Sequence, residues 1–357
     1  MSKGLPQNIE DLINKALKGD DLGVRRQAII DLGYHKQKEI YPQLVKLLDD
    51  SSPSIQQAAV ISLGRFGNPQ AIDELTKPKI LQSPVTNIRW AAVIALGILG
   101  DYRVIDHLLE VLDDKEWIVR NQAVTELKDK IQEIIQLRDS SHTRILIKLL
   151  SLENEDIINL ANQGFCALGE ESVTALVDVL QSLSPVLRKN AARTLGELNS
   201  FRAVDELISI INDEDWEVRE SVVKALGEIG DRRALEPLVN SLFDNVEKVQ
   251  KQAMEALVQF GKLSTHPLLN ALALEKDKFN LRAIILTLGK IGDKKSLPVL
   301  VDHLRSSYFV VRMATVHALR QFRAEQVLEV LVPHLSFNTS DIDVLLKDAK
   351  NKNNLPL

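Results

Sequence analysis

The sequence predicts an all-α fold, a right-handed α-solenoid (an α–α superhelix) of about ten helical pairs. The first observation is a recurring core, [Val/Ile]-Arg-x-x-Ala-x-x-x-Leu-Gly, whose clearest copy is VRESVVKALG at residues 218–227. The second is the leucine at the ninth core position, which returns every 31 residues at Leu195, Leu226, Leu257, Leu288 and Leu319. Ten copies of the core occupy residues 24–33, 55–64, 88–97, 119–128, 160–169, 187–196, 218–227, 249–258, 280–289 and 311–320. A fixed period of this length is typical of stacked repeats that bury their apolar faces against their neighbours.

Composition and charge exclude several classes of partner. The chain of 357 residues has a net charge of −5, so it has no electrostatic reason to bind phosphate backbones. Aromatic residues make up 4% of the chain and provide few stacking platforms for single strands. One cysteine excludes a disulfide framework, and no apolar run approaches the ~18 residues of a membrane span. With no signal-peptide pattern, we expect a soluble, cytoplasmic protein that binds neither nucleic acid nor a membrane.

Each unit is expected to contain two helices. The chain begins with a helix over residues 8–18, capped by Asn8, and later first helices include residues 203–211 and 234–243. Acidic turns then lead into a second helix that carries the recurring core. Several units close with a Gly-Asp pair, in which glycine allows the left-handed conformation that ends a helix. These pairs are Gly100-Asp101, Gly230-Asp231 and Gly292-Asp293.

The second helix has one buried side and one exposed side. When the last core position is numbered zero, positions −9, −5, −2 and −1 point within about 60° of one direction and hold mostly apolar or small residues. Positions −7 and −3 point the opposite way. Arginine at position −8 suits a bidentate pair with an aspartate in the acidic turn of its own or the adjacent unit. We therefore expect a structural ladder from Arg25, Arg89, Arg120, Arg188, Arg219 and Arg312.

The unit resembles a HEAT repeat, specifically the short HEAT-like repeat first associated with phycobilin lyases (the PBS lyase HEAT-like repeat). The resemblance covers nearly the whole chain and is carried by the core, the acidic turn and the Gly-Asp stop. Lys128, Val258 and Arg320 depart from the closing glycine, and residues 169–180 match the family's shorter first helix. The resemblance implies an armadillo-like superhelix with the second helices on its concave side. It does not imply one function, because scaffolds, adaptors, lyase subunits and enzymes all carry such repeats.

Two stretches break the period. About ten extra residues near 129–138 either extend the second helix of the fourth unit or form a separate turn. We expect residues 1–335 to form a single HEAT-like solenoid that is irregular at this insertion. Residues 336–357 are expected to form a polar cap followed by a disordered tail, because repeat arrays need polar ends.

The sequence identifies no catalytic centre. It has no phosphate-binding loop and no cysteine pair, and its seven histidines occupy different repeat positions. Deoxyhypusine hydroxylase, a metal enzyme of this fold class, is marked by repeated His-Glu dipeptides, and no histidine here precedes glutamate. Cys166 has no cationic neighbour in sequence that would activate its thiol. We expect no catalytic residue, no metal and no cofactor, which makes an enzyme the less favoured class.

An apolar row is expected on the exposed side of the first three units. Such a row indicates a partner surface, unless strong curvature or the N-terminal helix covers it. Units six to eight instead present interleaved charges, which are typical of a solvated face. Trp117 and Trp216 stand just before their second helices, where we expect packing between units. The candidate partner-binding residues, at positions −7 and −3, are Arg26, Ile30, Gln57, Ile61, Trp90 and Ile94.

These observations favour a protein-interaction scaffold or adaptor that binds a partner helix or extended peptide on its concave face. The alternative, implied by the resemblance alone, is a bilin lyase or lyase-like chaperone acting on phycobiliproteins. Such a protein needs a tetrapyrrole pocket, and the sequence identifies no chromophore-binding residues. A protein-bound visible absorbance band after incubation with free bilin would favour the lyase.

Overall fold

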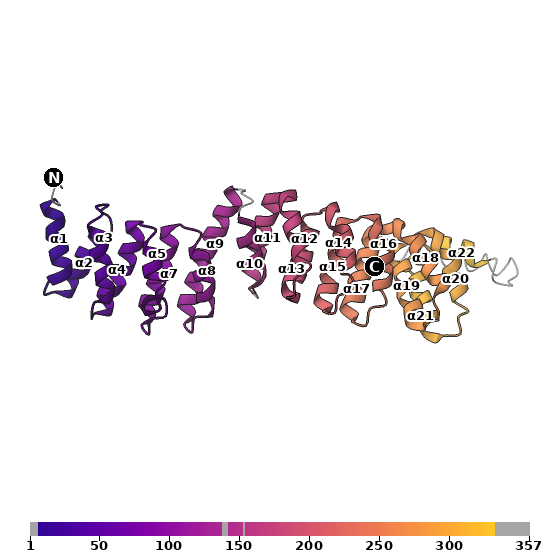
Figure 1. Ribbon diagram of the computed structural model, residues 1–357. Helices are drawn as coiled ribbons and strands as arrows, with labels where there is room; N and C mark the ends of the chain where they lie inside the picture. Colours follow the sequence, from indigo (N-terminus) through magenta and orange to yellow (C-terminus); the bar gives the residue numbers. More distant parts are fainter. Residues whose placement is uncertain (1–5, 138–141, 153, 333–357) are drawn as a thin grey trace. The chain divides into compact units, whose positions relative to one another are not determined.

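The computed structural model describes residues 6–137, 142–152 and 154–332 of the protein. Over these ranges the chain forms helices joined by short turns, and no strand occurs in them (Figure 1). Each of the ten core copies lies in its own second helix. These are α2 (Leu22–Leu32), α4 (Pro53–Phe66), α7 (Thr86–Leu99), α9 (Trp117–Leu137), α11 (Glu155–Leu168), α13 (Pro185–Glu197), α15 (Trp216–Ile229), α17 (Glu247–Phe260), α19 (Lys278–Ile291) and α21 (Phe309–Leu319).

The first helices are shorter, and most of them begin or end in a 3-10 turn. They are α1 (Gln7–Lys18), α3 (Ile40–Lys46), α5 (Ala71–Leu75) with α6 (Pro78–Leu81), α8 (Val104–Glu110), α10 (Thr143–Leu150), α12 (Val173–Val179), α14 (Val204–Ser209), α16 (Leu235–Ser241), α18 (Thr265–Leu274) and α20 (Leu297–His303). A further helix, α22 (Ala324–Leu331), follows the tenth pair. The predicted all-α solenoid of helical pairs is therefore confirmed.

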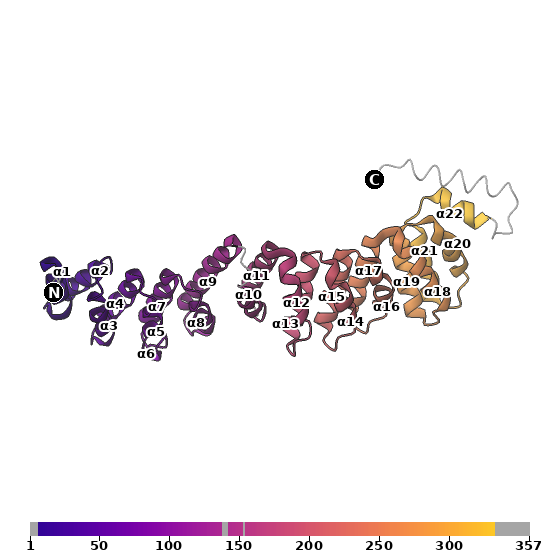
Figure 2. The ribbon, with the colours of Figure 1, turned by 45° about the horizontal axis from the view of Figure 1, so that its top comes forward.

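The chain divides into two compact units. The first comprises Met1–Ile145 and Glu153–Ala167, and the second comprises Leu146–Leu152 and Leu168–Leu357. Within the first unit α2, α4, α7 and α9 stack in sequence order, and within the second α13, α15, α17, α19 and α21 do the same (Figure 2). The extra residues near 129–138 lengthen α9 to 21 residues, so the first of the two forms expected for this insertion is observed. A single solenoid over residues 1–335 stays a prediction, and the cap and tail expected at 336–357 lie outside the described residues.

The core follows the predicted stripe in most repeats, but Val24, at position −9 of the first copy, is 49% exposed. In α15, Val218, Val222 and Leu226 at positions −9, −5 and −1 are completely buried. The left-handed helix stops are also confirmed, since Gly230 and Gly292 have φ of 70° and 67°. The aspartate after each of these glycines accepts a hydrogen bond from the backbone N–H two residues on, as Asp231 does from Arg233 (2.9 Å). One residue pair thus ends a second helix and starts the next first helix.

The closing glycine brings consecutive second helices into close contact. A Cβ placed on Gly64 would lie 2.7 Å from Cα of Ala95, at position −2 of the next unit. The same relation joins Gly227 to Ala256 and Gly289 to Ala318. Glycine is required here because the neighbouring backbone occupies the space of any side chain. This contact sets the spacing between the helices that carry the candidate site.

Replacing Gly64 with alanine is therefore expected to lower the free energy of unfolding by about 1–3 kcal/mol, the usual cost of overpacking. Gly23→Ala is the matched control, because its Cβ would meet only the carboxylate tip of Asp21 at 3.0 Å. The control should change stability by less than about 1 kcal/mol. Urea denaturation of the two variants would measure the difference, and equal values would contradict the close contact.

The arginine ladder is confirmed for four of its six arginines, with the aspartate supplied by the next repeat. Arg89 donates to both carboxylate oxygens of Asp114 (2.7 and 2.9 Å) and to the carbonyl of Ser83 in its own turn (2.7 Å). Each guanidinium of this type therefore ties two successive turns together. The same pairing, 25 residues apart, joins Arg25 to Asp50, Arg188 to Asp213 and Arg219 to Asp244. Arg120 and Arg312 keep the contact with the carbonyl six residues earlier, to Asp114 (2.6 Å) and Ser306 (2.8 Å).

Two smaller expectations are wrong. Asn8 does not cap the first helix, because α1 begins at Gln7 with Pro6 in the cap position. Trp117 does not pack between units, since 68% of its surface is exposed. Trp216 does, because the ammonium of Lys248, on the next second helix, lies 4.5 Å from the centre of its ring.

Candidate functional site

The predicted partner-binding residues lie on three neighbouring second helices of the first unit. Helix α2 carries Arg26 and Ile30, α4 carries Gln57 and Ile61, and α7 carries Trp90 and Ile94. Ile30, Ile61, Trp90 and Ile94 form what we call the apolar row. Arg26 is exposed, and the other five residues are half-buried. The row is thus accessible, but less so than a freely exposed helix face would be.

Backbone contacts hold the three helices at close range. Gly33 of α2 lies against Ser62 of α4, whose hydroxyl donates a hydrogen bond to the carbonyl of Ile29 (2.9 Å). Gly64 of α4 lies in the same way against Ala95 of α7. Because these are contacts between small, buried groups, they leave the helices little freedom to slide. The apolar row therefore lies on a rigid surface, which loses little conformational freedom when a partner binds.

A carboxylate lies next to the row, and sequence reasoning missed it. Gly97 ends the core of α7, and the Oε2 atom of Glu126 on α9 lies 1.8 Å from the position that a Cβ on Gly97 would take. The amide of Gln122 donates a hydrogen bond to Oε1 of Glu126 (2.8 Å). Burial raises the pKa of Glu126 above its usual value, and this hydrogen bond opposes the shift. The available signal was position −2, where glutamate replaces the usual small residue.

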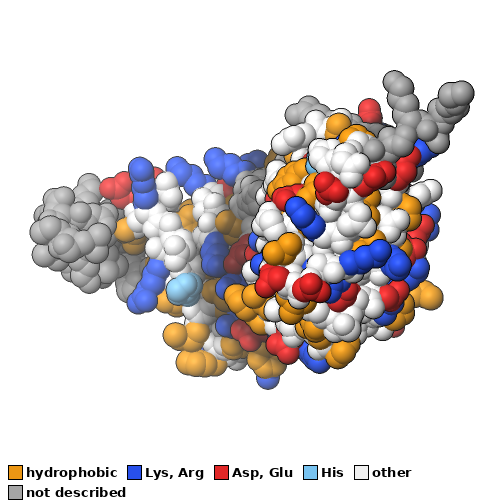
Figure 3. All heavy atoms as spheres, turned by 90° about the vertical axis from the view of Figure 1, so that its left-hand side faces the viewer, with side chains coloured by type: hydrophobic (Ala, Val, Ile, Leu, Met, Phe, Trp, Pro, Cys, Tyr) orange, Lys and Arg blue, Asp and Glu red, His pale blue; other side chains and the backbone are white. Residues whose placement is uncertain are grey.

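Helices α13, α15 and α17 of the second unit present charges at positions −7 and −3, whereas α19 and α21 carry the accessible apolar residues Leu286 and Met313 there. A hollow of about 300 Å³ is lined by Arg193, Glu220, Lys224, Glu228 and nearby residues of α13, α15 and α17. Lys224 pairs with Glu228 at 3.7 Å, and Lys189 pairs with Glu217 of the next helix at 2.9 Å. The interleaved charges are therefore largely matched within the protein, as expected for a solvated face. Figure 3, which views the molecule from its N-terminal end, shows acidic, basic and apolar side chains mixed over the near surface as well.

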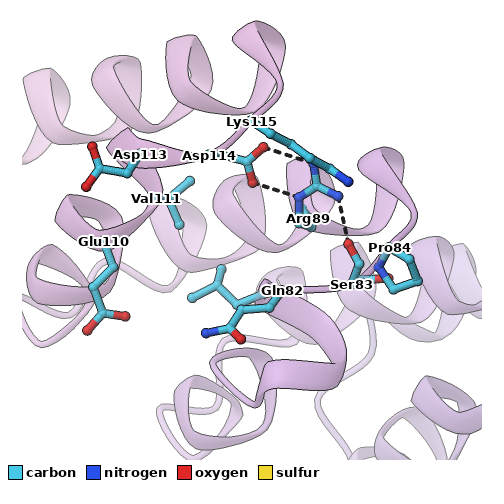
Figure 4. Close-up of a pocket in the computed structure, with 10 residues that line it drawn as sticks. Gln82, Ser83, Pro84, Arg89, Glu110, Val111, Asp113, Asp114 and Lys115 are labelled. Carbon is cyan, nitrogen blue, oxygen red and sulfur yellow. Dashed lines mark hydrogen bonds and ion pairs between the residues drawn. The ribbon is translucent and has the colours of Figure 1, made fainter.

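A second hollow lies at the turns of the first unit (Figure 4). Its volume is about 370 Å³, and Gln82, Glu110, Asp113 and Lys115 are among the residues around it. Arg89 at its wall is already bound by Asp114 and Ser83, as the dashed lines in Figure 4 show. Because its N–H groups already bind Asp114 and Ser83, Arg89 cannot also donate two parallel hydrogen bonds to an anionic ligand. The ladder thus accounts for the charged side of this hollow.

Other chemical features of the described part of the chain are few. No group of three or more His, Cys, Asp and Glu side chains is placed to hold a metal ion in the ranges that the structure covers. Cys166, the one cysteine of the sequence, is exposed and forms no disulfide. None of the helices described has both the length and the apolar content needed to cross a membrane.

Comparison of the sequence with known families identifies its class. The family model for HEAT repeats matches residues 9–77, 78–128, 173–258, 242–320 and 267–343. These matches cover most of the sequence, and the chain belongs to the HEAT-repeat family. The stretch between 128 and 173 that they omit contains the extra residues of α9 and the boundary between the two units. No curated protein matches the sequence significantly.

Several solved structures are similar at low sequence identity. An engineered protein is 20% identical, with 88% of this chain and 98% of that one covered and a TM-score of 0.36. Kap121p is 15% identical with a TM-score of 0.47, and the match covers 97% of this chain but 45% of Kap121p. The CpcE–CpcF complex of phycocyanin lyase from a Nostoc species is 18% identical, with 77% and 98% covered and a TM-score of 0.28.

Proposed function

We propose that this chain is a protein-interaction scaffold that binds an amphipathic helix or extended peptide of a partner along the apolar row. The observation that carries the proposal is the alignment of Ile30, Ile61, Trp90 and Ile94 on three adjacent second helices, half-buried and open to a partner. Accessible apolar anchors grouped in this way suit the apolar face of a helix packed against them. The proposed setting is the cytoplasm, which fits a sequence whose single cysteine cannot form an internal disulfide.

The contrast with α13 and α15 of the second unit supports this choice of surface. There the corresponding positions carry Lys189, Arg193, Glu220 and Lys224, and the three cations pair with carboxylates of the protein. Apolar side chains that remain accessible have no such partner within the protein and gain most from burial by another chain. Nothing among the described residues favours the bilin-lyase alternative over this one.

Replacing Trp90 with alanine is expected to weaken partner binding by about 2 kcal/mol or more, because a central tryptophan commonly dominates such a surface. Proteins that co-purify from native lysate with the wild type would be identified, and their affinities for each variant then measured by calorimetry. Ile61→Gln should also weaken binding.

Lys189→Ala and Lys251→Ala, on the charged face of the second unit, are the matched controls and should change the affinity little. Helix content from circular dichroism should be the same in all four variants. A native partner that binds Trp90→Ala as tightly as wild type would remove the apolar row from consideration.

A further inference from the structure

Glu126 breaks the pattern that holds consecutive second helices together. Position −2 faces the closing residue of the preceding unit, and small side chains allow the close contact described above. In the first repeat, position −2 holds Asp31, and the helix that precedes it is α1. In the other eight repeats, position −2 holds Ser62, Ala95, Ala167, Thr194, Ala225, Ala256, Thr287 and Ala318. A half-buried carboxylate at this position costs desolvation energy, so folding stability alone does not explain why glutamate occupies it.

The carboxylate lies in line with Trp90 and Ile94, the two residues that α7 contributes to the apolar row. Trp90, Ile94 and Gly97 follow one another on a single face of α7, because seven residues turn an α-helix within 20° of two full turns. Glu126 places Oε2 where the side chain of Gly97 would begin. Its charge therefore stands at the end of the line from Trp90 through Ile94, about 10 Å along the helix from Trp90.

The surroundings leave the charge of Glu126 only partly compensated. Its hydrogen-bond donor, Gln122, is neutral. Lys130 also acts on it, but the ammonium of Lys130 is bound by both carboxylate oxygens of Glu133 (2.9 and 3.1 Å). Asp129 acts in the opposite direction. The raised pKa of Glu126 agrees with a desolvated carboxylate that would gain from a nearby cation.

We propose that Glu126 is the charged anchor of the apolar row and receives a lysine or arginine of the partner helix. This inference rests on the proposed function. The occupant that fits is an amphipathic helix running along α7, with apolar residues over Trp90 and Ile94 and a basic residue about one turn later, since residues three and four apart lie on one face of a helix. A charge-assisted hydrogen bond at a half-buried site then fixes the register and direction of the bound helix.

The test uses a displayed library of amphipathic helices with two leucines four residues apart and randomised neighbours. Peptides are selected on the wild-type protein and counter-selected on Trp90→Ala. We expect a lysine or arginine to be enriched three or four residues after the second leucine. For an enriched peptide, replacing that residue with norleucine should weaken binding to the wild type at least tenfold, measured by fluorescence anisotropy.

Glu126→Gln should remove that tenfold preference and bind both peptides equally. Glu110→Gln, which makes the same charge change on α8, is the control and should keep the preference. Glu126→Ala restores the residue type common at position −2, so its melting temperature should be no lower than that of the wild type. A clear fall in melting temperature would make Glu126 a structural residue and overturn the inference.

The outcomes separate this inference from the proposed function. If no selected peptide depends on Trp90, both fail. If the peptides depend on Trp90 but show no basic preference, or if Glu126→Gln keeps the preference, the apolar row remains a binding surface and the role of Glu126 is overturned.

Discussion

Replacing Leu226 with alanine is expected to lower the free energy of unfolding of its region by about 2–5 kcal/mol, the usual cost of a cavity left by a core leucine. Leu226 is completely buried in α15, between the neighbouring helices α13 and α17. In a stacked array each repeat contacts only its neighbours, so the loss should be concentrated there. Hydrogen exchange followed by mass spectrometry would locate the loss. The increase in exchange rate over the wild type should be larger in α13, α15 and α17 than in α2 and α4.

Leu183→Ala is the matched control, because Leu183 is 99% exposed in a turn of the same unit. It should change stability by less than about 0.5 kcal/mol. Equal loss of protection in every helix of Leu226→Ala would show a single cooperative core instead of coupled repeats.

The helices and their buried faces could be predicted because ten copies of one pattern show which helix positions stay apolar. Position −1 is leucine in every copy, and all ten of these leucines are buried. A local exception such as Lys128 in place of the closing glycine does not disturb a face defined by all copies together. The sequence could not show whether each ladder arginine pairs with the aspartate of its own turn or of the adjacent repeat, because a single helix does not show which turn lies beside it.

Features that depend on contact between units were harder to predict. Trp216 is covered because Lys248, 32 residues later, lies on the next second helix. The 41-residue step after α9 places no second-helix residue at the same distance from Trp117, and this tryptophan is exposed. The apolar row is half-buried for a related reason, since the glycine contacts bring neighbouring side chains closer than a single helix reveals.

The position of Glu126 shows the same limit. Sequence assigned position −2 to the buried stripe without stating which residue it meets. Only the contact between Gly97 and the next repeat places the carboxylate on the face of α7 that carries Trp90 and Ile94. The apolar row could therefore be predicted from single helices, but the charge beside it could not.

Removing the Arg89 guanidinium is expected to be more costly than removing any exposed charge of the protein. The side chains of Arg89 and Asp114 are 4% and 9% exposed and form two hydrogen bonds. Arg89→Ala leaves the Asp114 carboxylate buried without its cation, which typically costs about 3–5 kcal/mol. Urea denaturation at neutral pH would measure this loss, and hydrogen exchange should increase in the turn at 111–116.

The effect should depend on pH in a defined direction. The hydrogen bond from Arg89 lowers the pKa of Asp114 below its ordinary value, against the effect of burial. A carboxyl group whose pKa is lower in the folded state stabilises the protein above its unfolded pKa, near 4, and loses that contribution as the pH falls through the folded value. The difference in unfolding free energy between wild type and Arg89→Ala should therefore be largest at neutral pH and shrink in acid.

Arg120→Ala provides the matched control for the ladder. Arg120 occupies the same helix position but binds the carbonyl of Asp114 (2.6 Å), and residue 145, where the ladder spacing would place an aspartate, is isoleucine. Losing one charged hydrogen bond should cost about 1.5–3 kcal/mol, with little dependence on pH between 3 and 7. Because Arg89 serves the turns, its removal should leave the affinity of a peptide bound at Trp90 nearly unchanged. A sharp fall in that affinity at unchanged stability would make the ladder arginines ligands instead of structural ties.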